Sequence, residues 1–312
     1  MNEAIHYSHP FPESLASRLT RTALTLLGRK TSIAEEMQSG RFRQQPQAIP
    51  GSVKRQCNIQ VSELDGRTIW TLTPKEARND IRVLYLHGGA YIRNIISYQW
   101  RMIGELCVRT GATIIVPDYP LAPEANWESA HAFTGKVWQQ LTATKGTDKL
   151  VLMGDSAGGG LALSFAQTLA AAQQPQPAQI LLLSPWLDLA SNNPGMLKIN
   201  PYDQMLEPLG LRLAGEAWAR GTTLEDYRVS PLFGEFKDLA PLTIFIGTGD
   251  ILFPDVVKLR EKLAAEHIPL NYFVFPRMMH VWMAVGWMPE ARSAIKRIAA
   301  MIRGDQPQPP SA

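Results

Sequence analysis

The sequence contains little cysteine, little excess charge and no long hydrophobic run. Its 312 residues include two cysteines, Cys57 and Cys107, with no C-x-x-C spacing, which argues against a disulfide framework and a zinc site. The net charge of +3 and the 19% of charged residues indicate neither a nucleic-acid partner nor a strongly acidic one. No apolar stretch is long enough to cross a bilayer, and the first residues do not resemble a signal peptide. We therefore expect a soluble cytoplasmic protein with no stable membrane association.

The first 50 residues differ from the rest and are expected to form a helical cap segment. They contain helical patches at 13–27 and 33–39, followed by a Gln/Pro-rich passage that ends at Pro50-Gly51. Two expected strands follow, at 54–62 and 68–73. They are joined through Asp65-Gly66, a dipeptide that strongly favours a hairpin.

Beyond residue 80, expected strands and helices alternate. Strands rich in Val, Ile and Leu, separated by helices, predict a mostly parallel sheet that is covered by helices on both faces. Such a sheet places its ligand site at the carboxyl ends of the strands. The segment 190–230 interrupts the alternation and is expected to be a cap insertion within a main domain of residues 51–303, whereas the tail 304–312 is expected to be disordered. The expected strands are 81–86, 113–116, 149–153, 179–183, 242–246 and 271–275, and the expected helices are 98–109, 128–143, 159–172, 254–266 and 289–302.

The pentapeptide Gly154-Asp155-Ser156-Ala157-Gly158 directly follows one of these strands and precedes a helix. Strand, sharp turn and helix form the context in which G-x-S-x-G is a nucleophile elbow. The serine must lie on a strained turn, and side chains at the two glycines would clash where strand and helix pass closely. The sequence predicts a nucleophilic Ser156; the alternative is a glycine-rich turn with a capping serine.

A serine hydroxyl needs a base that takes its proton. Of the six histidines, His280 lies in the loop after the last expected strand, at the edge where the site is expected. The base needs a carboxylate that orients it, and Asp250 directly follows a buried strand between serine and histidine in chain order. The alternatives are Asp255 as the acid, and a loop role for His280, packed against Trp282 or Trp287.

Ester attack also needs donors that stabilise the negative oxygen. The tetrapeptide His87-Gly88-Gly89-Ala90 follows the strand 81–86, and glycines leave their backbone amides open to approach. We expect the amides of Gly88, Gly89 and Ala157 to form an oxyanion hole. The ring of His87 is expected to hold the loop rather than to act as a base.

Taken together, these residues resemble the hormone-sensitive-lipase family of carboxylesterases, within the α/β-hydrolase fold. The resemblance runs from about residue 80 to 303 and rests on five segments, 87–91 (HGGAY), 118–124 (DYPLAPE), 154–159 (GDSAGG), 184–188 (SPWLD) and 250–255 (DILFPD). It implies a cap over the site, short acyl and often acetyl esters as substrates, and neither cofactor nor metal. Because some members dimerise through the sheet edge, the resemblance also allows a homodimer.

Tyr91 and Trp186 adjoin these motifs and are expected to line the substrate pocket. The apolar cap residues Met196, Met205, Leu206 and Trp218 would bound the acyl or alcohol pocket, or simply pack the cap on the core. Two departures from the family concern backbone freedom: Ala90 stands where a third glycine is common, and Val281 follows the histidine where glycine is usual.

The sequence therefore predicts a serine carboxylesterase for short-chain acyl esters. An amidase or peptidase with the same triad is the first alternative, and the sequence leaves it open. A small-molecule receptor on this fold is the second, but such receptors typically lack a triad residue. A nucleotide site is not indicated, because Leu252 occupies the last glycine position of the G-x-G-x-x-G run that begins at Gly247.

Overall fold

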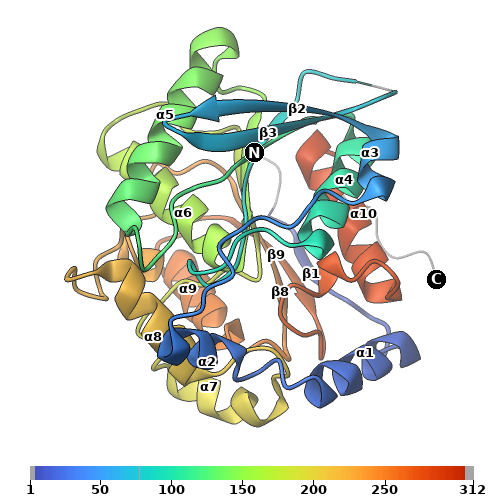
Figure 1. The fold of residues 1–312 in the computed structure, drawn as a ribbon, viewed down its shortest axis with the longest axis vertical. Helices are drawn as coiled ribbons and strands as arrows, with labels where there is room; N and C mark the ends of the chain where they lie inside the picture. Colours follow the sequence, from blue (N-terminus) through green and yellow to red (C-terminus); the bar gives the residue numbers. More distant parts are fainter. Residues whose placement is uncertain (1–3, 77, 306–312) are drawn as a thin grey trace.

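A nine-stranded sheet forms the centre of the molecule (Figure 1). The computed structural model describes residues 4–76 and 78–305. The strand order is β1-β9-β8-β7-β6-β4-β5-β3-β2, and all neighbours are parallel except the pairs β2–β3 and β3–β5. The strands are β1 (His6–Ser8), β2 (Cys57–Leu64), β3 (Arg67–Pro74), β4 (Arg82–Leu86), β5 (Thr113–Pro117), β6 (Leu150–Asp155), β7 (Gln179–Leu183), β8 (Leu242–Gly247) and β9 (Leu270–Phe275).

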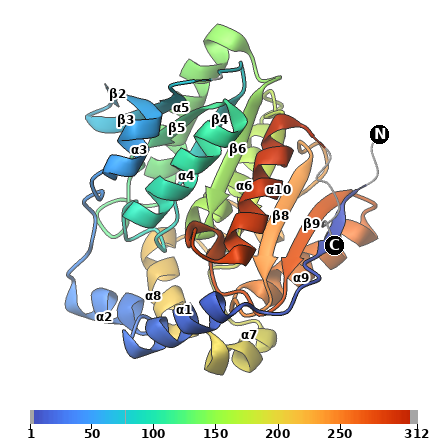
Figure 2. The same ribbon diagram turned by 90° about the vertical axis from the view of Figure 1, so that its right-hand side faces the viewer.

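Helices cover both faces of this sheet (Figures 1 and 2). One face carries α5 (Trp127–Lys145), α6 (Ser156–Ala171) and α9 (Phe253–Ala265), and the other carries α3 (Gly51–Gln56), α4 (Ser97–Thr110) and α10 (Pro289–Arg303). Successive residues of a strand alternate between the two cores: Leu84 and Leu86 pack on the α6 side, and Val83 and Tyr85 on the α4 side. Because both faces are buried, β4 has no polar face, as the uninterrupted apolar run predicts.

A cap gathers at one end of the sheet, at the bottom of Figures 1 and 2. It consists of α1 (Leu15–Leu26), α2 (Ser32–Ser39), α7 (Pro194–Ile199), the short 3-10 helix η1 (Asn200–Tyr202) and α8 (Pro208–Ala219). Two distant segments pack together here, since a side chain at Gly210 of α8 would meet Ile33 of α2. Two further 3-10 helices, η2 (Pro231–Phe233) and η3 (Trp282–Ala284), lie in loops of the main domain.

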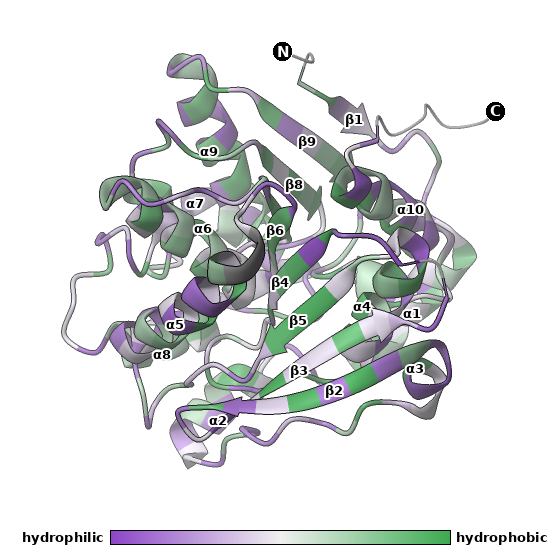
Figure 3. Cartoon of the chain, turned by 90° about the horizontal axis from the view of Figure 1, so that it is seen from above, coloured by the Kyte–Doolittle hydropathy of each residue, from purple (hydrophilic) through white to green (hydrophobic). Residues whose placement is uncertain are grey.

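The expected α/β class, with a mostly parallel sheet and a helical cap, is confirmed. The hairpin is confirmed too: Asp65 and Gly66 both have positive φ, 50° and 74°, between the paired residues Leu64 and Arg67. Figure 3 shows that β5 is hydrophobic over most of its length, whereas hydrophobic and hydrophilic residues alternate along the edge strand β2.

Two expectations about strands were wrong or incomplete. The expected strand 54–62 begins only at Cys57, because residues up to Gln56 belong to helix α3. Val53 of this helix is buried against Gly104 of α4, so tertiary packing selects the helical turn. Strand β1 was not expected within the segment 1–50. From residue 306 on, the expected disordered tail lies outside the described residues.

The direction of strand addition reverses at β4, which pairs with β5 on one side and β6 on the other. In open α/β sheets such a switch point opens the crevice where ligands bind. The registered pair Leu86 and Gly154 brings the carboxyl ends of β4 and β6 side by side. The loop after β4 and the elbow after β6 therefore meet at this place. Among the described helices, none is long and apolar enough to cross a membrane.

Candidate active site

Ser156 lies at the turn between β6 and α6. Its φ of 52° falls in the left-handed region, which a residue with a side chain adopts only at a cost. The close approach expected at the glycines is present, because a Cβ on Gly158 would collide with the backbone oxygen of Leu86. The turn therefore projects the serine from the end of the strand, as the motif predicts.

His280 lies between Ser156 and Asp250. Its Nε2 is 2.8 Å from the Oγ of Ser156, and its Nδ1 is 2.8 Å from the Oδ2 of Asp250. All three side chains are nearly closed off from solvent, with exposed fractions of 8% for Ser156, 5% for His280 and 0% for Asp250. The structure thus brings together three residues that are separated in the sequence and were selected from it individually.

Three carboxylates, those of Asp250, Asp203 and Asp155, act on the pKa of His280. Burial is the largest single effect and lowers the pKa of this imidazole, but the charge and the hydrogen bond of Asp250, with smaller contributions from Asp203 and Asp155, together raise it above its ordinary value. A carboxylate beside an imidazole favours the protonated ring. The arrangement therefore stabilises the imidazolium that forms when the ring accepts a proton.

The alternative acid, Asp255, does not reach the histidine. It lies in the first turn of α9, and its Oδ1 accepts a hydrogen bond from the Nδ2 of Asn193 at 2.7 Å. Between the two candidates, only Asp250 contacts His280.

The expected oxyanion hole needs one correction. The amide of Gly88 donates to the Oδ1 of Asp155 at 2.9 Å, so it is already occupied. Within the described part of the chain, the amides of Gly89 and Ala90 donate no hydrogen bond. The amide of Ala157 lies in the first turn of α6, where N–H groups lack an acceptor within the helix.

Asp155, the last residue of β6, joins the serine elbow to the glycine loop after β4, a role the sequence did not reveal. Besides Gly88, its buried carboxylate accepts hydrogen bonds from the hydroxyl of Tyr85 and from the Nε2 of Gln99, the latter at 3.0 and 3.2 Å. Because Gln99 is on α4 and Gly88 follows β4, one carboxylate ties the elbow to the glycine loop. The residue before the serine is variable in the G-x-S-x-G motif, so the motif alone does not predict that Asp155 ties the two loops together.

The expected structural role of His87 is confirmed. Its ring is buried and stacks on Tyr119, with ring centroids 4.5 Å apart. Burial lowers its pKa, and its Nδ1 lies 3.0 Å from the carbonyl oxygen of Gly88. The ring therefore supports the loop from behind.

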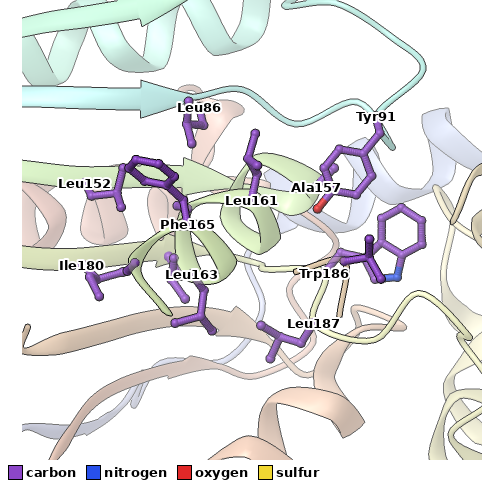
Figure 4. Close-up of a cluster of buried hydrophobic side chains, with 14 of the residues drawn as sticks. Leu86, Tyr91, Leu152, Ala157, Leu161, Leu163, Phe165, Ile180, Trp186 and Leu187 are labelled. Carbon is purple, nitrogen blue, oxygen red and sulfur yellow. The ribbon is translucent and has the colours of Figure 1, made fainter. Parts of the chain in front are cut away.

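Tyr91 and Trp186 lie together at the start of α6 (Figure 4). A side chain at Gly160 would meet both the hydroxyl of Tyr91 and the carbonyl of Trp186. The ring of Tyr91 stacks on Trp218 of the cap at 4.0 Å and on Trp186 at 5.6 Å. All three rings are buried, so they form a wall between cap and core rather than an open surface.

Comparison with known proteins identifies the family of the fold. A family described as the alpha/beta hydrolase fold matches residues 83–284. The chain belongs to the α/β-hydrolase family. Within residues 4–76 and 78–305 of this hydrolase, no group of three or more His, Cys, Asp or Glu side chains is arranged to hold a metal ion.

Relatives of this hydrolase carry names of ester-cleaving enzymes. An acetyl-hydrolase of Streptomyces hygroscopicus is 30% identical over 73% of this chain and 78% of its own length. A triacylglycerol lipase of Mycobacterium tuberculosis is also 30% identical, over 72% of this chain, but the match spans only 47% of that longer protein. A solved esterase/lipase structure from an uncultured bacterium covers 93% of this chain and 98% of its own, with a TM-score of 0.80 at 24% identity, a likeness that concerns the fold.

Proposed function

We propose that this hydrolase is a serine carboxylesterase that forms an acyl-enzyme with short-chain acyl esters. The observation that carries the proposal is the unbroken chain of contacts from Ser156 through His280 to Asp250, with both contacts at 2.8 Å. A nucleophile within hydrogen-bond reach of a base, which a third group orients, is the arrangement that covalent acyl transfer requires. The names of the relatives, esterase and acetyl-hydrolase, support the same reaction class.

In the proposed first half-reaction, His280 takes the proton of the Ser156 hydroxyl on Nε2 while Oγ bonds to the ester carbonyl carbon. Asp250 accepts the hydrogen bond of Nδ1–H, which selects the productive tautomer and stabilises the imidazolium. The carbonyl oxygen becomes negative and is held by free backbone amides, for which Gly89, Ala90 and Ala157 are available. The bond to the alcohol oxygen then breaks, and His280 returns the proton to the leaving alcohol.

In the second half-reaction, water replaces the alcohol. His280 removes a proton from the water as its oxygen attacks the acyl carbon, and the same amides hold the new oxyanion. The bond to Ser156 Oγ then breaks, the serine regains its proton from His280, and the carboxylic acid leaves. No cofactor or metal takes part in the proposed cycle.

The preference for short acyl groups rests on the aromatic wall of Tyr91, Trp186 and Trp218. In this proposal the three stacked and buried rings limit the length of the acyl chain unless the cap moves. The low exposure of the triad supports the same preference, because a closed site suits a small ester better than a lipid surface.

We place this small-molecule esterase in the cytoplasm, a proposal that the two buried free thiols of Cys57 and Cys107 support.

Hydrolysis of p-nitrophenyl esters from acetate to palmitate, by the native protein and by Ser156→Ala, tests the proposal. We expect activity on the acetate and butyrate esters, little on palmitate, and a loss of at least about 10³-fold in kcat in the variant. Activity that survives in Ser156→Ala would show that another nucleophile acts. A folded native protein with no activity on any ester would contradict the esterase assignment and direct attention to amides.

A further inference from the structure

The cap contributes a carboxylate that lies behind the proposed triad. Asp203 follows η1 and precedes α8, and only 3% of it is exposed. Within the described part of the chain it forms no ion pair. A carboxylate that is buried without a counter-ion needs hydrogen bonds to offset its lost hydration. The hydrogen-bond donors to Asp203 therefore indicate its role.

Each oxygen of Asp203 serves a different part of the molecule. Oδ1 accepts hydrogen bonds from the amides of Met205 and Leu206, at 2.7 and 2.9 Å, and so closes a turn of the cap. Oδ2 accepts from the amide of Ile251 at 2.8 Å. Since Ile251 directly follows Asp250, the second oxygen reaches from the cap to the loop that carries the proposed catalytic acid.

That loop is held by two carboxylates in succession. The amide of Ile251 donates to Asp203, and the next amide, of Leu252, donates to the Oδ1 of Asp250 at 3.0 Å. The other oxygen of Asp250 contacts His280. The orientation of Asp250 relative to the imidazole therefore depends on a loop that the cap anchors from outside.

We propose that Asp203 is a positioning residue for the reaction: it fixes the Asp250 loop through Ile251 and places a second carboxylate beside that loop. The proposal rests on the proposed function, since it assumes that His280 is the base. Among the described residues, the charged groups that act on the pKa of His280 are Asp250 after β8, Asp203 in the cap and Asp155 at the end of β6, and all three are carboxylates. Burial and then Asp250 raise the pKa of Asp203, while its three amide donors lower it.

Asp203→Asn is the sharpest variant, because an amide has a single acceptor oxygen. That oxygen can accept either from the amides of the cap turn, Met205 and Leu206, or from the amide of Ile251. The NH2 group of the asparagine then faces the N–H donors that are left without an acceptor. For hydrolysis of p-nitrophenyl acetate we expect kcat to fall about tenfold with KM within about twofold, because Asp203 does not reach the substrate. Loss of the negative charge lowers the pKa of His280, so the acidic limb of kcat/KM should move to lower pH by about half a unit or more.

Asn193→Ala is the matched control. It removes another hydrogen bond between cap and core, the one from Asn193 to Asp255 on α9, but no charge near His280. We expect it to lose stability and to keep the native acidic limb. If Asp203→Asn is less stable yet keeps the native kcat and acidic limb, Asp203 is only structural and the inference is overturned.

A second variant covers the case in which Asp203→Asn does not fold. Asp203→Glu keeps the charge and both acceptor oxygens, so its acidic limb should stay near the native position even where kcat is reduced. If the acidic limb of kcat/KM moves to lower pH in Asp203→Glu as well, the electrostatic role of Asp203 is overturned. Failure of the proposed function looks different, because it would appear as an inactive native protein or as an active Ser156→Ala.

Discussion

A buried carboxyl without a full set of partners should make stability depend on pH. Asp255 is buried on α9, its Oδ2 has no hydrogen-bond partner, and burial raises its pKa from 3.8 to about 7. A carboxyl whose pKa is higher in the folded protein stabilises it fully below the unfolded pKa, and this contribution is lost as the pH rises through the folded pKa. The native protein should therefore lose stability between about pH 4 and pH 7 on account of this group.

Asp255→Asn tests this expectation, because the amide keeps the acceptor for Asn193 and cannot ionise. We expect the free energy of unfolding to rise on the order of 2 kcal/mol at pH 8 and to change little at pH 4, as measured by urea unfolding at both pH values. Asp226→Asn is the control of opposite sign: Arg228 lowers the pKa of Asp226, so that variant should lose stability at pH 8. If Asp255→Asn raises the free energy of unfolding by the same amount at pH 4 as at pH 8, the cause is packing and not ionisation.

At the scale of the loop after β9, the backbone beside the proposed base is strained. Val281 has a φ of 48°, a region that β-branched residues rarely adopt. Its amide donates to the Oγ of Ser184 at 3.2 Å, so the loop is held in this conformation next to His280. A side chain at this position therefore costs free energy that glycine would not.

Comparing Val281→Ala with Val281→Gly isolates the strain, because both variants lose the same branched group. In the middle of a helix or strand, a protein with glycine is less stable than one with alanine by about 0.5–1 kcal/mol. Here we expect the order to reverse, with Val281→Gly more stable than Val281→Ala by about 1 kcal/mol in urea unfolding. The usual order, with alanine more stable, would mean that the left-handed backbone is not a burden on this loop.

Among the strands and loops, some could be predicted from the sequence and others could not. Strands β4 to β8 were predicted within two residues, because continuous Val/Ile/Leu runs identify strands buried on both faces. Ser156, Asp250 and His280 followed from the ends of β6, β8 and β9. The occupied amide of Gly88 and the reach of Asp203 to Ile251 could not be predicted, since each depends on a contact between segments distant in sequence. Strand β1 has three residues, too few for a periodic pattern, and its partner strand is more than 260 residues away.

Across the whole molecule, residues near the start of the chain cover the edge of β9 with a short strand, which becomes the outermost strand of the sheet. Strand β1 runs parallel to β9, with the amide of Tyr272 donating to the carbonyl of Ile5 at 2.7 Å and the amide of His9 to that of Val274 at 2.9 Å. The ring of His9 stacks on Phe275 at 4.7 Å. An open edge strand is a template for pairing with another chain, so β1 occupies the groups that a dimer through this edge would need.

Removing residues 1–9 should therefore change the association state. We expect the full chain not to pair through β9, and the truncated protein to form dimers or larger species as its concentration rises, because the edge of β9 is uncovered. Size-exclusion chromatography with light scattering over a hundredfold concentration range measures this. Tyr7→Ala is the control, since it removes the ring under the guanidinium of Arg297 but keeps the strand's backbone bonds, and should behave as the full chain does. A truncated protein with the same mass as the full chain at every concentration would show that β1 does not protect the edge.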